Sequence, residues 1–226
     1  MRYIYSILIF LLMLCACNKD ASEIGSLLNG IEAYIEEHPE EALKVLESVN
    51  REELTTRKLK AKHSLLYSMA LDKNYIDVTT DSIIAPAVNY YKYHGKDEER
   101  FKSLYYAGRV YQNAGDIEAA MERFVEAERY ISNQVDKKIV ARLYKAKMVA
   151  YRDVFDYRSA LDQAQTAARY YLSAKDSIRY LNAVNDIIVL YSLLEDKESE
   201  DQYLAILSSN MHLLSTSQIS RYYGIK

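Results

Sequence analysis

The sequence predicts an all-α fold in which antiparallel helix pairs repeat along the chain as an α-α superhelix. Between residues 100 and 210, identical residues recur at a spacing of forty, and self-similarity at a fixed period is the signature of a stacked repeat. The chain of 226 residues holds only 6 glycines and 2 prolines, so the residues that usually form turns and end strands are scarce. Two columns carry the period most clearly: Tyr111, Tyr151 and Tyr191, and Asp116, Asp156 and Asp196.

Residues 1–16 have the layout of a secretory signal peptide. Arg2 supplies a positive charge, and the apolar run from Ile4 to Leu14 is shorter than the roughly 20 residues that a membrane-spanning helix needs. The run ends in Leu14-Cys15-Ala16-Cys17, which resembles the lipobox of bacterial lipoproteins. The resemblance implies cleavage before Cys17, acylation of Cys17 and a lipidated tether over residues 17–22. The other interpretation is an ordinary signal peptide with an incidental cysteine.

Charge and cysteine content narrow the classes of partner. Lys and Arg total 29 against 32 Asp and Glu, a net charge of −3, which argues against binding to nucleic acid. Cys15 would leave with the signal peptide and Cys17 would carry lipid, so no disulfide is expected in the mature chain. The fold must therefore be stabilised by its apolar core alone.

Residues 101–134 show the repeat most clearly, as two amphipathic helices that meet at Gly115-Asp116. Asp116 is placed to accept hydrogen bonds from the free N–H groups of the second helix and to complement its dipole. Apolar and small residues recur at helical spacing on both helices. They are Leu104, Ala107, Gly108 and Tyr111 on the first helix and Ala120, Phe124 and Ala127 on the second.

This pattern of small and aromatic residues resembles the tetratricopeptide repeat. Residues 101–134 match it closely, residues 141–174 put Met148 in place of the glycine, and residues 181–214 put Glu200 in place of a small residue. The resemblance implies a tetratricopeptide-like (TPR-like) solenoid over residues 23–214. A period of forty exceeds the usual thirty-four and approaches HEAT and armadillo lengths, so the extra residues are expected to lengthen helices and their joints.

Two further helix pairs are expected upstream. Pro39 opens a helix with acidic residues in its first turn, which would be the second helix of a pair that begins near Glu23. Residues 54–71 and 82–94 would form the next pair. A connector over residues 72–81 joins them and is expected to break the forty-residue period.

The C-terminal end shows no polar capping helix of the kind that normally covers the last stacking face of a solenoid. A tail over residues 215–226 follows the last unit, and the next repeat would begin at Arg221. Three explanations stay open: the tail forms a short cap, a partner covers the end, or the chain belongs to something longer. An uncovered end would expose Leu204, Leu207, Leu213 and Leu214.

No catalytic or cofactor-binding pattern stands out in the sequence. The 4 histidines are scattered without metal-ligand spacing, and neither a Gly-x-Ser-x-Gly elbow nor a glycine-rich phosphate loop occurs. Paired acids such as Glu36-Glu37 fit solvated helix faces better than acid–base chemistry. We therefore expect no enzyme activity, no cofactor and no bound metal.

A partner-binding groove is predicted on the side of each first helix that the core does not use. In tetratricopeptide arrays the corresponding face receives extended peptides, and five cations there would attract an acidic segment. Most tyrosines are expected to serve packing, with Tyr105 as an exposed contact. Ordinary solvation of helix surfaces explains the same residues. The candidates are Lys102, Tyr105, Arg109, Gln112, Arg142, Lys145, Arg152, Asn182 and Asn185.

The two resemblances together imply a membrane-anchored lipoprotein that acts as a protein-interaction scaffold or sensor module in a bacterial cell envelope. Two or three acyl chains, at about 0.8 kcal/mol for each buried methylene, give persistent attachment. Asn18 lacks the acid that holds some lipoproteins in the inner membrane, which favours the outer membrane. The alternative is a glycan- or nutrient-binding outer-membrane lipoprotein. Association through the C-terminal end is also expected.

Overall fold

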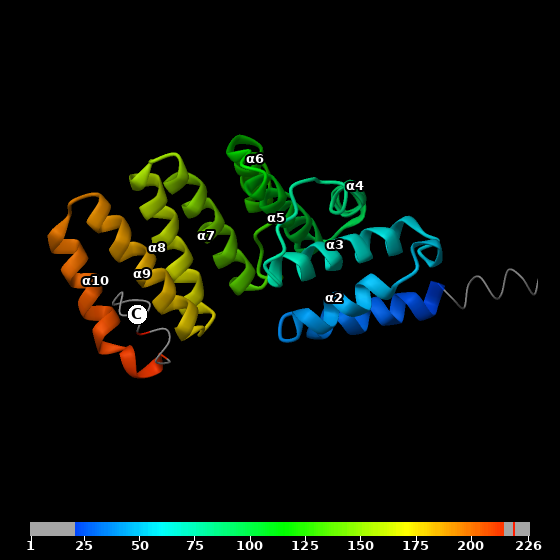
Figure 1. The fold of residues 1–226 in the computed structure, drawn as a ribbon, viewed down its shortest axis with the longest axis horizontal. Coiled ribbons are helices and arrows are strands. Elements are labelled where there is room, and N and C mark those ends of the chain that lie inside the picture. The colour runs from blue at the N-terminus through cyan, green and yellow to red at the C-terminus, as the bar shows by residue number, and fades with distance from the viewer. Residues whose placement is uncertain (1–20, 215–218, 220–226) are drawn as a thin grey trace, which may run out of the picture. The chain divides into compact units, whose positions relative to one another are not determined.

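The computed structural model describes residues 21–214 and residue 219 (Figure 1). The predicted signal peptide, Cys17 and most of the tail over 215–226 lie outside these residues. Every regular element in the described ranges is a helix, and none of those residues forms a strand, so the predicted all-α helical-repeat fold is confirmed. None of the helices in these ranges is both long and apolar enough to cross a membrane.

The chain divides into two compact units, Met1–Asp116 and Ile117–Lys226, called the first and second unit below. In each unit, helices that follow one another in the chain pack side by side. The first unit contains a helix over 21–34, α2 (Pro39–Ser48), the short 3-10 helix η1 (Arg51–Glu53), α3 (Arg57–Lys73), α4 (Ala85–His94) and α5 (Asp97–Asn113). The second contains α6 (Ile117–Glu128), α7 (Lys137–Asp153), α8 (Tyr157–Ser173), α9 (Ser177–Leu193), α10 (Lys197–Ser209) and η2 (Met211–Leu213).

The forty-residue period is a property of the helices themselves. α3, α5, α7 and α9 each contain 17 residues and begin at residues 57, 97, 137 and 177. The period therefore reaches one helix further upstream than the sequence predicted. The second helices α6, α8 and α10 begin at residues 117, 157 and 197, whereas α4, which follows the connector, begins at 85 and α2 at 39. The pair α3 and α4 is confirmed, with α3 starting at Arg57 because the Thr56 hydroxyl accepts from the N–H of Leu59 at 3.2 Å.

Each of these helices ends in the same turn, with one residue in the left-handed backbone region. The N–H of the third residue after the helix donates to the carbonyl five residues earlier, the hydrogen bond of a Schellman motif. It measures 3.0 Å from Asp116 to Tyr111, 2.9 Å from Asp156 to Tyr151 and 3.0 Å from Asp196 to Tyr191. The left-handed residues have φ between 57° and 77° and share the same register: Tyr75, Gly115, Phe155 and Glu195.

The aspartate column also starts the following helices, as predicted. The side chain of Asp156 accepts from the N–H of Ser159 at 3.1 Å, and that of Asp196 accepts from Ser199 at the same distance. These bonds satisfy N–H groups that a helix N-terminus leaves free. At the corresponding position after α3 the chain has Ile76, which offers no acceptor, and the next helix begins only at Ala85.

The core of the second unit is built from small residues on α8. Ala160, Ala164 and Ala167 are each no more than 1% exposed, so α7 and α9 can approach α8 closely. Tyrosines fill the edges of this core, and the rings of Tyr144 and Tyr170 stack with centroids 5.6 Å apart. The predicted packing role of the repeat tyrosines is confirmed for the members of this cluster.

The last helix pair is covered by the chain that follows it. Leu207 is 3% and Leu214 8% exposed, in a cluster with Leu181, Val184 and Ile188 of α9, and Ile219 packs against that cluster. Leu207 and Leu214 are therefore not exposed as an uncovered end would leave them, although Leu213 is 43% exposed. Leu214 and Ile219 of the chain after α10 are the residues that pack on this end.

Candidate functional site

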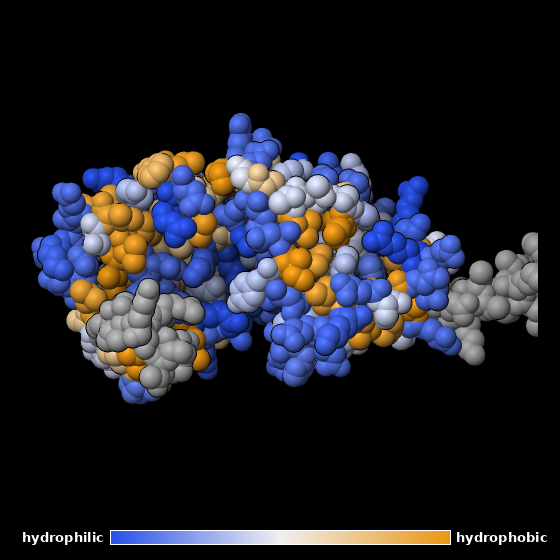
Figure 2. Space-filling model, viewed as in Figure 1, coloured by the Kyte–Doolittle hydropathy of each residue, from blue (hydrophilic) through white to orange (hydrophobic). Residues whose placement is uncertain are grey.

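The predicted groove residues fall into two groups, one in each unit. Helix α5 of the first unit carries four of them, and α7 and α9 of the second unit carry the rest. Each group is considered on its own. On the face seen in Figure 2, hydrophobic residues are interspersed with charged and polar ones in both units, as on ordinary solvated helices.

The α5 group differs from the expectation in its aromatic member. Tyr105 is 4% exposed, stacked on Phe101 at 6.5 Å and edge-on to Tyr106 at 4.8 Å between ring centroids. It is a core residue, so the prediction of an exposed contact was wrong. Forty residues earlier, Leu65 on α3 is also buried, at 3% exposure. Lys102 pairs with Glu98 at 2.5 Å on the same helix.

Arg109 joins two helices of the first unit. Its Nε donates to Asp72 Oδ1 at 2.9 Å, near the end of α3, and its Nη1 donates to Gln112 Oε1 at 2.5 Å. Burial is the largest single effect and lowers the pKa of the guanidinium, but Asp72, Tyr105 and Asp77 together outweigh it, so the pKa of Arg109 is raised. Three predicted groove positions on α5, at residues 102, 109 and 112, are therefore engaged in contacts within the unit.

In the second unit, the predicted face is continuous across α7 and α9. Lys145 Nζ on α7 lies 2.9 Å from Asp186 Oδ2 on α9, which shows that the two helices present neighbouring surfaces. Val189 of α9 is 47% exposed beside this pair. Arg152 contacts Asp153 at 3.3 Å, with both side chains 44% exposed. The half-buried residues Arg142, Asn182 and Asn185 complete the face.

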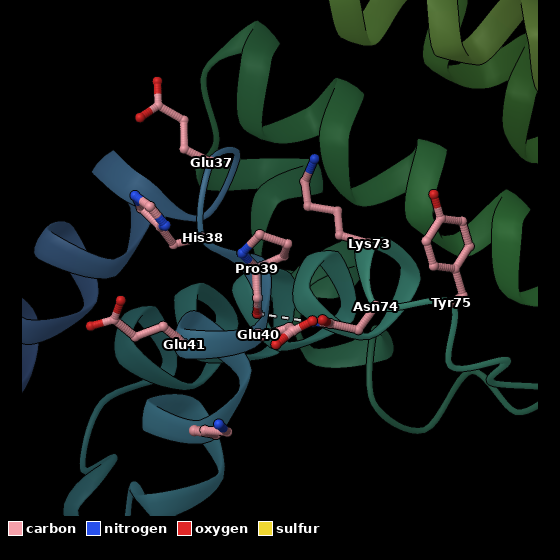
Figure 3. A pocket seen from close by; sticks show the side chains of 9 residues that line it. Glu37, His38, Pro39, Glu40, Glu41, Lys73, Asn74 and Tyr75 are labelled. Carbon is pink, nitrogen blue, oxygen red and sulfur yellow. Dashed lines mark hydrogen bonds between the residues drawn. The ribbon is translucent and has the colours of Figure 1, made fainter. Parts of the chain in front are cut away.

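A surface pocket of about 570 Å³ lies between the start of α2 and the end of α3 (Figure 3). The carboxylates of Glu37, Glu40 and Glu41 point in different directions around it, and the Asn74 side-chain amide donates to the carbonyl of Pro39 at 2.9 Å. No group of three or more potential ligands in the described ranges is arranged to hold a metal. The pocket is a solvated recess rather than a metal centre.

The sequence did not predict a second recess of the first unit, along the line where α3 and α4 meet. Two pockets of about 400 and 390 Å³ adjoin there and share Lys60 and Pro86. We call them together the α3–α4 groove. Its cations are Arg51, Arg57 and Lys60, and its rings are Tyr67, Tyr90, Tyr93, His63 and His94.

Electrostatics distinguish the α3–α4 groove from the predicted face. Within the described residues, no carboxylate forms an ion pair with Arg51, Arg57 or Lys60. His63 is buried and its Nε2 donates to the carbonyl of Leu46 at 3.0 Å. Burial lowers the pKa of His63, so this ring is neutral near pH 7 and the positive charge of the groove belongs to the three longer side chains.

Comparison of the chain with protein-family models, with curated proteins and with solved structures found no match. The chemistry of the described residues is therefore the basis for assigning a function. Two surfaces are candidate binding sites: the α7–α9 face of the second unit and the α3–α4 groove of the first.

Proposed function

We propose that this chain is an interaction module of the tetratricopeptide type, held at a bacterial membrane by lipid on Cys17, and that its α7–α9 face binds a segment of a partner protein. The four helices α3, α5, α7 and α9, each of 17 residues and spaced by forty, support the repeat assignment. The Leu-Cys-Ala-Cys run before Asn18 supports the lipid anchor and an outer-membrane address in the cell envelope. Stacked repeats present extended surfaces of the kind that proteins use for binding.

The observation that carries the proposal is the ion pair between Lys145 and Asp186. It joins α7 and α9 into one surface, on which half-buried Asn182 and Asn185 offer amide groups to a peptide backbone and Val189 offers apolar area. An extended segment can therefore contact both helices at once.

An acidic partner segment suits this face better than a basic one. The pair between Arg152 and Asp153 is open to solvent, and exposed pairs stabilise by only about 0–1 kcal/mol. A carboxylate of the partner can therefore replace Asp153 at little cost. Arg142 adds a second cation on α7.

Site-specific photo-crosslinking tests the proposal. A photoreactive amino acid replaces Val189 in the lipidated protein in its native membrane, with Asp162 on the exposed side of α8 as the control position. The proposal predicts a protein adduct from position 189 alone, weakened by Arg142→Glu with Arg152→Glu. Equal adducts from both positions would reject the face. Retention of an oligosaccharide with no protein adduct would favour the glycan-binding alternative.

A further inference from the structure

The α3–α4 groove combines positive charge with aromatic rings in a chain of net charge −3. Arg57 and Lys60 lie one turn apart on α3, and Arg51 lies at the opposite end of the groove. Glu52 and Glu53 follow Arg51 in the chain, yet neither lines either pocket. The groove therefore presents three cations with no neutralising carboxylate among its lining residues.

The aromatic residues of the groove are partly open to solvent. Tyr93 is 71% exposed, and the ammonium of Lys92 lies 5.5 Å from the centre of its ring. Tyr90 packs on His94 with ring centroids 4.9 Å apart. Tyrosine is enriched where a protein meets the headgroup region of a membrane, because the ring is apolar and its hydroxyl remains hydrated.

The Arg57 end of the groove lies at the end of the first unit where the described chain begins. The helix over 21–34 runs parallel to α3, with Glu32 2.7 Å from Lys62 and Glu36 2.7 Å from Lys73 (Figure 1). A Cβ atom at Gly25 would lie 3.7 Å from Leu59, so residue 21 is at the same end as Arg57. The C-terminal end of α4 is there too, since Tyr93 and His94 share a pocket with Arg57.

Few residues separate this end from Cys17 in the sequence. Cys17 precedes Ala21 by four residues, and four extended residues span at most roughly 14 Å. If Cys17 is acylated, its lipids bring this end of the first unit to the membrane surface. The groove is then close enough for its cations to meet lipid headgroups, since electrostatic attraction acts over about 8 Å at physiological salt.

We infer that the α3–α4 groove binds the phosphate groups of anionic membrane lipids and orients the first unit against the membrane. The inference rests on the proposed lipid anchor. The planar guanidinium groups of Arg51 and Arg57 match two phosphate oxygens at once, and Lys60 supplies a compact charge where the two pockets join. Each Lys or Arg near an anionic surface strengthens membrane contact by roughly fivefold.

A fluorescence experiment on the lipidated full chain tests this contact. Cys15 leaves with the signal and Cys17 carries lipid, so an added cysteine is the one free thiol for a fluorophore. Thr55→Cys places the fluorophore beside the groove, and Asp77→Cys places it beyond the other end of α3; both positions are exposed. The protein is reconstituted into phosphatidylcholine vesicles that contain a lipid with a spin label on its headgroup, with or without phosphatidylglycerol.

Phosphatidylglycerol is expected to increase quenching severalfold at position 55 and to change it little at position 77. The triple variant R51E/R57E/K60E should lose the increase, while the matched variant K137E/R158E/K175E, with three exposed cations reversed in the second unit, should keep it. High salt should also remove it, because salt screens the attraction. Circular dichroism confirms folding, and the milder R57Q/K60Q replaces the triple variant if that one unfolds.

Two results would overturn the membrane contact. One is equal quenching at position 55 in both kinds of vesicle. The other is stabilisation by free inorganic phosphate together with no effect of phosphatidylglycerol. Phosphate would then raise the melting temperature of the wild type but not of R51E/R57E/K60E, and the groove would bind a soluble phosphate compound. The mass of the N-terminal peptide is measured first. Absence of lipid on Cys17 would refute the anchor, whereas lipid without added quenching would refute only the groove.

Discussion

The N–H of Ile76 donates to the carbonyl oxygen of Leu71 at 3.0 Å, and Tyr75 between them has a φ of 57°. The same hydrogen bond and a left-handed residue recur at intervals of forty, from Asp116 to Tyr111 around Gly115 and again at Asp156 and Asp196; the same turn also follows α8, around Lys175. The turn that ends these helices is therefore conserved in geometry while its residues change. It defines the repeat better than any single column of side chains does.

The left-handed position predicts that introducing glycine at residue 195 and removing it at residue 115 change the stability in opposite directions. A non-glycine residue there costs roughly 1–2 kcal/mol, partly offset by the entropy that glycine adds to the unfolded chain. Replacing exposed Glu195, with φ 58°, by glycine should raise the free energy of unfolding by about 0.5–1 kcal/mol. Urea denaturation at pH 7 measures the change.

Gly115→Ala is the matched control, because φ is 77° and no atom lies within 4 Å of the added methyl group. Any loss of stability there comes from the backbone alone, and a loss of about 1 kcal/mol is expected. Two changes with the same sign would contradict the role of this position.

The spacing of tyrosine and aspartate was sufficient to predict the helix pairs, because Asp156 and Asp196 each cap a helix through local hydrogen bonds. It did not reveal that α3 belongs to the same register. Leu71 and Ile76 replace the tyrosine and the aspartate there, yet the turn needs only their backbone groups. Ile76 has no side chain that can cap a helix. This explains why α4 starts late, although the turn that ends α3 keeps the forty-residue period.

The capping aspartates predict acid sensitivity. Hydrogen bonds from the Ser159 side chain and N–H lower the pKa of Asp156, and those from Ser199 do the same for Asp196. Because the folded pKa lies below the unfolded value, the stabilisation is complete above about pH 4 and disappears as pH falls through the lowered pKa. Unfolding should therefore become easier across that window.

The variant D156N/D196N tests whether the two aspartates cause the loss of stability at low pH. Asparagine caps a helix about as well as aspartate but does not titrate. We expect stability near that of the wild type at pH 7 and a smaller decline on acidification, followed by thermal unfolding monitored by circular dichroism. A decline of unchanged size would show that other carboxylates dominate.

The pair between Lys147 and Glu128 predicts a strong coupling in the second unit. Nζ and Oε1 are 2.6 Å apart, and the Lys147 side chain is only 8% exposed. Burial and then the Glu128 carboxylate raise the pKa of the adjacent Tyr144 to about 12. Glu128→Gln leaves the ammonium buried without its counter-charge and should cost about 2 kcal/mol.

A double-mutant cycle with Lys147→Met measures this coupling by urea denaturation. The double variant should be more stable than the sum of the single losses predicts, because removing both charges removes the unpaired one. Additive losses would show that the two side chains do not interact in solution.

Arg109 is expected to matter for stability rather than for partner capture. Arg109→Gln breaks the contact with Asp72, which is partly buried, and should lower the free energy of unfolding of the first unit by about 1 kcal/mol. The yield of the adduct from position 189 should stay the same. A lost adduct with unchanged stability would restore Arg109 to the binding site.

The candidate site was harder to predict from the sequence than the fold. Helical spacing placed Arg109 and Lys145 on one side of their helices, but their acidic partners, Asp72 and Asp186, are 37 and 41 residues away in the chain. Such pairing depends on which helices become neighbours. The α3–α4 groove was missed for the same reason: Arg57 and Tyr93 lie on different helices and meet only because α3 and α4 are antiparallel.

Lipid on Cys17 is the claim on which the proposed function and the membrane contact both depend. Mass spectrometry of the N-terminal peptide of the protein extracted from membranes measures it directly. The expected result is a chain that begins at Cys17, carries a diacylglyceryl group on the thiol, and leaves the membrane fraction when Cys17 is changed to alanine. An unmodified Cys17 in the mature protein, with unchanged membrane association of the alanine variant, would contradict the account.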